Sequence, residues 1–239
     1  MTTRLALILQ NPKIILSVLA TFLMATSIGF ALVEYERDVN YISITGNVSE
    51  MQRDSVVQTL LSMKTSMSDI ESVKQVLAGI GWIKGAGVAL RWPDELVVTI
   101  RPQQAIAYWN DDAFINSEGA VFETKYLVGG DLPQLYGPVG SEQVVMGHYQ
   151  SLNRALLKSG HFIEVLMLNE RGALVFENQH GVQVSLGSVD LKQRLQRFLK
   201  VSARVEELEK SALGFDTRYT NGVAVNFIEV ENFKIAETP

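Results

Sequence analysis

The sequence contains no cysteine, which excludes both a disulfide framework and a thiolate metal site. Histidine is scarce as well. His148, His161 and His180 are the three histidines, and no two of them have the spacing of metal ligands on one helix. The HExxH pattern of zinc proteases does not occur. We therefore interpret the histidines as solvated or structural residues, and the sequence predicts no metal site.

The signatures of other enzyme classes are missing too. There is no GxSxG nucleophile elbow. The segment "GIGWIKGAGVAL" (79–90) superficially resembles a nucleotide-binding loop, but Lys84 stands where the third glycine belongs, and the glycines follow a helical pattern instead of a strand. Neighbouring acids such as Asp111 and Asp112 are typical of a solvated surface. We therefore predict no catalytic residue, no cofactor and no small-molecule substrate; the protein is expected not to be an enzyme.

An excess of positive charge is also absent. The chain has 21 basic and 26 acidic residues, a net charge of −5. Arg4 and Lys13 precede a long apolar segment, and without them the remaining 19 basic and 26 acidic residues carry a net charge of −7. Nucleic-acid binding depends on a basic surface that neutralises phosphates. The sequence therefore predicts no nucleic-acid partner.

One long segment lacks charge altogether. Residues 14–33, "IILSVLATFLMATSIGFALV", are 20 consecutive uncharged residues, and as a helix with a rise of ~1.5 Å per residue they would span ~30 Å, the thickness of the hydrocarbon core of a bilayer. A cleaved signal peptide is the alternative, but its apolar core is only ~7–15 residues long and ends at a small-x-small site. Here the run is longer and continues into "EYERD". We expect an uncleaved transmembrane helix over 14–33.

The flanking charges predict the orientation of this helix. Arg4 and Lys13 lie before it, and the first 33 residues contain no acid. By the positive-inside rule, residues 1–13 are a cytoplasmic stub, and the remaining ~200 residues lie on the opposite side of the membrane.

Residues 39–102 have the pattern of a small β-α-α-β-β domain. "YISITG" (41–46) alternates like a strand, and apolar residues follow the helical period in two segments. These residues are Val56, Val57, Leu60 and Leu61 in 53–63, and Ile70, Val73, Leu77 and Ile80 in 68–82. Ser68 and Glu71 have the spacing of a capping box for the second helix. Two further strands, separated by Pro93 and Asp94, indicate a hairpin.

Residues 103–228 are rich in strands and contain two helices. A hairpin is expected over 114–123, and three strands between 164 and 187 form a meander. One helix covers 141–160, with Ser141 as its cap and Gly160 as its end; the other covers 188–209. The predicted fold class is therefore α+β: a single N-terminal transmembrane helix, the small domain, and a strand-rich C-terminal domain followed by a tail (229–239).

The last predicted strand raises the question of what covers it. In "GFDTRYTNGVAVNF" (214–227), Asn221 and Gly222 are a type I′ turn signal. We favour a hairpin with "VAVNF" (223–227) outermost; the alternative is one strand with a bulge at Gly222. In both cases "VAVNF" lies at a sheet edge with free backbone groups. Either the following tail or a strand from a partner could cover them.

These segments resemble the FtsQ/DivIB family of bitopic bacterial cell-division proteins. "ISITGN" (42–47), two helices and "IGWIKGAGVALRWPDELVVTIRPQQAIAYW" (80–109) resemble its POTRA domain, with a Trp-Pro-x-x-Leu turn and an Arg-Pro exit. "FINSEGAVF" (114–122), "LPQLYGP" (132–138) and "DTRYTNGVAVNF" (216–227) resemble its later signatures. The matches follow the family's order over nearly the whole chain. Phe227 is a departure, since the family often has tryptophan there.

The resemblance implies a scaffold without enzymatic activity. It implies a place in the cell inner membrane at the division septum, with the N-terminus cytoplasmic and the C-terminal domain periplasmic. The implied partners are FtsB and FtsL, together with other divisome membrane proteins, and the scaffold would link early to late division proteins. The implied partner-binding residues are Arg218, Tyr219, Gly222, Val223, Ala224, Val225 and Phe227.

Two other functions remain open from the residues alone. A POTRA domain also suits a component of a secretion or outer-membrane assembly machine. A membrane anchor followed by a large external domain also suits a cell-wall enzyme, although the sequence has no catalytic constellation.

Overall fold

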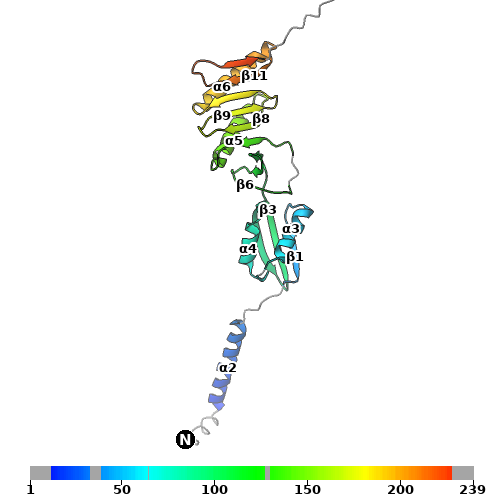
Figure 1. The fold of residues 1–239 in the computed structure, drawn as a ribbon. Helices are drawn as coiled ribbons and strands as arrows, with labels where there is room; N and C mark the ends of the chain where they lie inside the picture. The colour runs from blue at the N-terminus through cyan, green and yellow to red at the C-terminus, as the bar shows by residue number, and fades with distance from the viewer. Residues whose placement is uncertain (1–11, 33–38, 64, 127–129, 228–239) are drawn as a thin grey trace, which may run out of the picture.

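The computed structural model describes residues 12–32, 39–63, 65–126 and 130–227 (Figure 1). These residues form a mixed α+β structure with five helices and two sheets. The predicted tail, and the predicted cytoplasmic stub except for Pro12 and Lys13, lie outside the described residues.

Helix α2 extends from Pro12 to Leu32 and so includes all but the last residue of the uncharged segment 14–33. Its large apolar side chains are exposed where they are described, as at Leu19 and Phe22. Across the described part of the chain, no helix combines the length and the apolar character needed to cross a membrane.

The first sheet unit follows the predicted β-α-α-β-β order. It consists of β1 (Tyr41–Thr45), α3 (Glu50–Leu61), α4 (Ile70–Ala78), β2 (Ile83–Arg91) and β3 (Glu95–Pro102). The strand order is β1-β3-β2, with β1 parallel and β2 antiparallel to β3. Leu60 of α3 and Leu77 of α4 are fully buried against this sheet. Leu61, expected on the buried stripe of α3, is exposed.

The cap of α4 and the start of α3 differ from the sequence prediction. The predicted capping box of Ser68 and Glu71 is wrong, because the N-cap is Asp69, whose Oδ1 accepts hydrogen bonds from the backbone N–H groups of Glu71 and Ser72. A carboxylate at the cap also compensates the positive end of the helix dipole. Helix α3 begins three residues before the predicted start, because Ser49 and Gln52 form a capping box there.

The second sheet unit contains nine strands in the order β12-β11-β10-β9-β8-β7-β4-β5-β6. The strands are β4 (Ala107–Trp109), β5 (Ala113–Ile115), β6 (Val121–Phe122), β7 (Gln134–Tyr136), β8 (Ile163–Leu168), β9 (Leu174–Asn178), β10 (Gln183–Gly187), β11 (Ala212–Asp216) and β12 (Ala224–Phe227). Its helices are α5 (Glu142–Leu157) and α6 (Leu191–Glu207). Ser141 precedes α5 as predicted but makes no side-chain cap, because its hydroxyl donates to the Pro138 carbonyl.

One row of side chains crosses this sheet and forms much of its core. The row consists of Trp109, Leu135, Leu166, Phe176, Val184, Phe215 and Val225, each paired with the next across neighbouring strands. Helix α6 contributes Phe198, whose ring packs edge-on against Phe176 and Phe215. The flanking rows contain polar residues such as Glu177 and Gln183, so the sheet has one buried and one solvated face.

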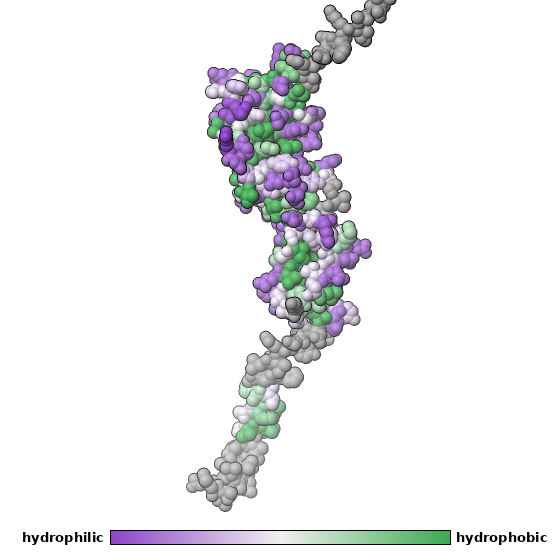
Figure 2. All heavy atoms as spheres, in the orientation of Figure 1, coloured by the Kyte–Doolittle hydropathy of each residue, from purple (hydrophilic) through white to green (hydrophobic). Residues whose placement is uncertain are grey.

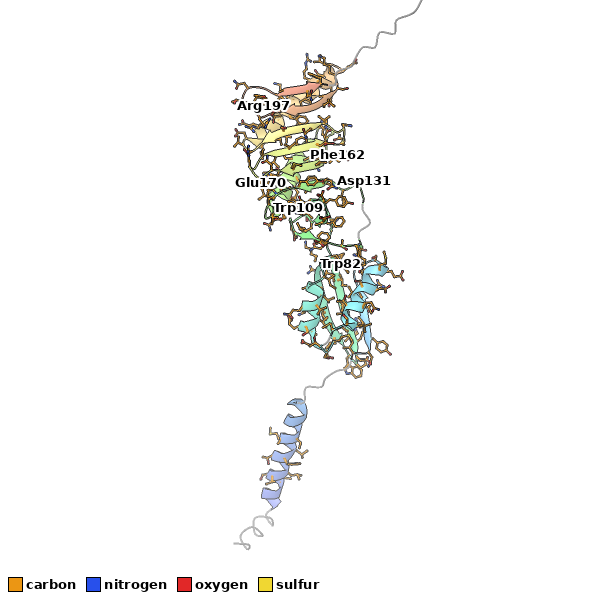
Figure 3. All side chains as sticks on the ribbon, in the orientation of Figure 1. Trp82, Trp109, Asp131, Phe162, Glu170 and Arg197 are labelled. Atoms are coloured by element: carbon orange, nitrogen blue, oxygen red, sulfur yellow. The ribbon has the colours of Figure 1, made fainter. Side chains whose placement is uncertain are left out.

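The two units share a core at β6. Phe122 of β6 is buried in the cluster of the first unit, together with Trp82. Phe114 and Tyr126 pack against the same cluster, and the ring centroids of Trp82 and Tyr126 are 6.0 Å apart. Figure 3 shows Trp82 at the end of the first unit that meets the second. Side chains beyond residue 102 thus complete the core of the first unit.

Candidate partner-binding edge

Strand β12 lies at one end of the nine-stranded sheet, and among the described residues it pairs with β11 alone (Figure 1). The pairing is antiparallel, with Asp216 opposite Ala224 and Phe215 opposite Val225. In such a pair, successive residues direct their backbone N–H and C=O groups alternately toward the partner strand and away from it. The outward groups of β12 therefore form an open edge that another strand could join.

The hairpin is present, but its predicted turn is wrong. Residues 217–223 form a seven-residue loop between β11 and β12, and neither Asn221 nor Gly222 is among the described residues with positive φ. A type I′ turn requires positive φ at both positions. The N–H of Thr217, which is fully buried, makes the last ladder bond of β11 to the Ser185 carbonyl of β10, and the Thr217 hydroxyl donates to the same carbonyl. The strand ends there because the Thr217 carbonyl accepts from Arg197 of α6 instead of from a neighbouring strand. Val223 consequently precedes β12 instead of belonging to it.

Two arginines of α6 donate to backbone carbonyls, one in the loop just after β11 and the other at the end of β10. Arg197 donates from Nη2 to the Thr217 carbonyl at 3.0 Å and from Nη1 to the Thr220 carbonyl. Arg194, one helical turn earlier, donates to the Leu186 carbonyl of β10 at 2.7 Å. Spacing of three residues places both guanidinium groups on the same side of the helix. The sequence prediction missed them; their signal was two arginines three residues apart in an amphipathic helix.

Arg218 and Asp216 form a two-pronged ion pair beside the edge. Arg218 donates from Nε to Oδ1 at 2.9 Å and from Nη2 to Oδ2 at 2.7 Å. The hydrogen bonds from the Arg218 side chain lower the pKa of the Asp216 carboxyl below its ordinary value. The Arg218 guanidinium is largely exposed, so the pair holds a cationic group at the surface near β12.

The predicted site residues gather on this hairpin but face different ways. Tyr219 is 60% exposed in the loop and Phe227 is 39% exposed at the end of β12. Ala224 is exposed, and a Cβ at Gly222 would meet nothing within 4 Å. Val223 and Val225 instead pack, half-buried, against the core. Val225 thus contributes its backbone to the edge while its side chain completes the core.

A basic residue accompanies the aromatic ring at the end of β12. The Lys210 ammonium lies 5.3 Å from the centroid of the Phe227 ring, a cation–π contact. The contact holds the Phe227 ring beside β11, at the C-terminal end of the open edge.

The structure also brings together two histidines that are distant in the sequence. His161 and His180 line one cavity of about 310 Å³, which Phe198, Val205 and Phe215 complete on its apolar side. The His161 Nε2 atom lies 3.8 Å from Glu206 Oε1. The sequence spacing gave no indication of this proximity, because it arises from the antiparallel pairing of β8 with β9, in which Ile163 is opposite Asn178.

Comparison with known proteins identifies the family. A cell division protein FtsQ from Hahella chejuensis is 33% identical over 201 residues, which cover 82% of this chain and 69% of that protein. The chain belongs to the FtsQ family. The resemblance based on the sequence motifs is thereby confirmed.

Further matches agree with this assignment. The FtsQ of Escherichia coli is 27% identical over 241 residues, covering 94% of this chain and 85% of that protein. The FtsQ of Xanthomonas campestris is 31% identical over 157 residues, covering 65% and 56% respectively. The family model described as "Cell division protein FtsQ/DivIB, C-terminal" matches residues 107–223. Its match therefore begins with β4 and ends just before β12.

Proposed function

We propose that this chain is a membrane-anchored, non-enzymatic scaffold of the bacterial divisome that captures FtsB, together with FtsL, along the open edge of β12. Membership of the FtsQ family supports a role in cell division. The first sheet unit would be the POTRA domain, which brings the protein to the septum and to other divisome membrane proteins. The second unit would present the binding edge.

The observation that supports this site most strongly is the row of core side chains that ends at Val225. Its other six members are buried, whereas Val225 is only half-buried. The strand of each buried member has a neighbouring strand on both sides, whereas in the described part of the chain the strand of Val225 has a neighbour on the β11 side alone. A partner strand beside β12 would supply the missing neighbour. It would also satisfy the outward backbone groups through main-chain hydrogen bonds.

Exposed side chains around the edge would select the partner. Tyr219 and Phe227 offer apolar aromatic surface at opposite ends of β12, and aromatic residues often dominate the energetics of interfaces. Arg218, held in place by Asp216, offers a guanidinium that suits an acidic side chain. A partner segment with an apolar strand and an adjacent carboxylate fits this arrangement.

The anchor in this proposal is α2, placed in the inner membrane with the N-terminus cytoplasmic and both sheet units periplasmic. The described part of the helix has an apolar surface, which Figure 2 shows as mostly green. Two of its hydroxyls are satisfied within the helix: those of Thr21 and Thr26 donate to the carbonyls of Ser17 and Phe22. Such internal bonding is needed where water cannot supply partners.

The test is co-purification of FtsB with the full-length chain in detergent. Phe227→Glu places a charge at the proposed contact and should reduce the amount of FtsB retained, and Tyr219→Ala should reduce it by removing an aromatic contact. Val121→Glu is the matched control, because Val121 is as exposed as Phe227 but lies on β6 at the opposite end of the same sheet. Equal retention by the wild type and both site variants would exclude β12 as the binding edge.

A further inference from the structure

The turn between β2 and β3 displays a tryptophan to solvent. Trp92 is 80% exposed, whereas Trp82 and Trp109, the other two tryptophans of the chain, are buried. Tryptophan combines a large apolar ring with one polar N–H group, and it is usually well buried in folded proteins. A ring so fully exposed at the end of a regularly paired hairpin therefore points to a contact outside the folded unit.

A second exposed aromatic residue lies at the same end of the sheet. Tyr41, the first residue of β1, is 67% exposed and is opposite Glu95 in the strand register. The turn is tied to this strand, because the backbone N–H groups of Asn40 and Tyr41 both donate to the Asp94 carbonyl, at 3.0 and 3.3 Å. The Asn40 side-chain amide also donates to the Asp94 carboxylate at 2.8 Å.

Chain connectivity keeps this end of the unit near α2. Eight residues separate Leu32, the end of α2, from Tyr41. Even fully extended, a chain of this length reaches only about 30 Å. The aromatic end of the first unit must therefore lie within that distance of the C-terminal end of the proposed anchor.

We infer that Trp92 and Tyr41 form an aromatic tip that inserts into the headgroup layer of the membrane and seats the first sheet unit on the bilayer surface. The inference rests on the proposed anchoring of α2. Tryptophan and tyrosine are enriched at membrane–water interfaces because the ring enters the apolar boundary while the polar atom stays hydrated.

The charges at the tip indicate which lipids it binds. Arg91 is paired with Glu95 at 3.2 Å, and Asp94 adds a carboxylate, so the tip carries no excess of positive charge. Anionic headgroups attract clusters of lysine and arginine, and the described residues of the tip include no such cluster. The tip therefore binds the membrane through its aromatic rings, and a bilayer of zwitterionic phosphatidylcholine is sufficient for this binding.

Fluorescence of the full-length chain reconstituted into vesicles tests this inference. The fluorescence of Trp92 is obtained by subtracting the emission of the Trp92→Phe variant from that of the wild type. Phosphatidylcholine brominated on its acyl chains should quench about half or more of this signal, as expected for a ring at the interface, and aqueous iodide should quench it much less than in detergent. Replacing some phosphatidylcholine by phosphatidylglycerol should leave the result unchanged.

Matched controls make the result specific. Trp82 lies at the other end of the nine-residue strand β2, about 30 Å from the tip at ~3.3 Å per residue, and its signal should not respond to bromine. In a Trp92→Phe background, Val139→Trp places a tryptophan on the second unit at a position that is even more exposed, at 99%. That residue should respond to iodide and not to bromine.

Co-flotation of the chain with the vesicles distinguishes a failure of the proposed anchor from a failure of the aromatic tip. If the chain floats with the vesicles but Trp92 responds to iodide and not to bromine, the aromatic tip is overturned and the anchor stands. Protection of Trp92 from both quenchers would indicate a protein contact instead and would also overturn the tip. If the chain does not float, the anchor fails and the inference fails with it.

Discussion

Arg197 of α6 donates a hydrogen bond of 3.0 Å to the carbonyl oxygen of Thr217, at the point where the chain leaves β11 (Figure 3 labels Arg197). The same guanidinium donates to the Thr220 carbonyl, so one side chain binds the first and the fourth residue of the loop 217–223. Arg197 thereby connects a core helix to the start of the proposed binding edge.

Replacement of Arg197 by methionine should loosen this loop. Methionine keeps the apolar stem but leaves the two carbonyls without their donor, so the free energy of unfolding should fall by about 1–3 kcal/mol. FtsB retention should fall as well, since Tyr219 lies in the loop. Thermal unfolding and co-purification measure the two effects. Lys200→Met is the control, because Lys200 lies one turn further along α6 and is exposed; similar losses in both variants would contradict a specific role for Arg197.

Proline substitutions in β12 should have opposite consequences at adjacent positions. Proline lacks the N–H group, and in antiparallel strands this group points inward and outward alternately. Of Ala224→Pro and Val225→Pro, one should destabilise the hairpin, and the other should leave folding intact but weaken FtsB capture. Circular dichroism melting and co-purification distinguish these outcomes.

Val225 also requires a packing control, because its side chain is half-buried. Val225→Ala removes the packing without removing the N–H group, so it should preserve FtsB retention better than a binding-defective proline variant does. If every proline variant that folds still retains FtsB fully, the binding site is not on β12.

The core of the first unit should depend on Leu77. This side chain of α4 is fully buried, and Leu77→Ala should lower the free energy of unfolding by ~2–5 kcal/mol, through lost burial and the cavity that remains. Leu61→Ala, on the exposed side of α3, should change it little. Chemical denaturation of both variants provides the measurement, and equal stabilities would show that the buried stripe of α4 has been misassigned.

Acid should weaken the Arg218–Asp216 pair. The pKa of Asp216 is lower in the folded state than its ordinary value, chiefly because of the hydrogen bonds from Arg218. The resulting stabilisation is present above the ordinary pKa of aspartate and is lost as the pH falls through the lowered, folded-state pKa. Arg218→Gln should raise the pKa of Asp216 and so reduce the part of the free energy of unfolding that is lost in acid.

An NMR titration of the Asp216 carboxyl group would measure this shift directly. Arg204→Gln is a suitable control, because Arg204 pairs with Glu207 on the exposed surface of α6, away from Asp216. An unchanged pKa of Asp216 in Arg218→Gln would show that another group is responsible for the shift.

Local sequence patterns predicted the elements well but their details less well. The apolar period of α4 correctly identified Val73 and Leu77 as buried. The capping residue was misplaced by one position, because serine at 68 and aspartate at 69 are both good N-caps and only the backbone geometry selects between them. The turn at Asn221 and Gly222 was misassigned for a related reason: the local signal was strong, but Arg197 of α6 binds the carbonyls of Thr217 and Thr220, and the strand ends before them.

The sequence by itself determined the β-α-α-β-β order of the first unit, the amphipathic faces of its helices and the position of the final strand at an edge, because periodicity and chain order carry that information within short segments. Only the tertiary structure decided that β10 pairs with β11, that Arg194 and Arg197 reach the ends of these strands, and that Val225 terminates the buried row. These relationships join residues far apart in the chain. An alternating pattern shows which side chains face the core, but it does not specify which strands become neighbours.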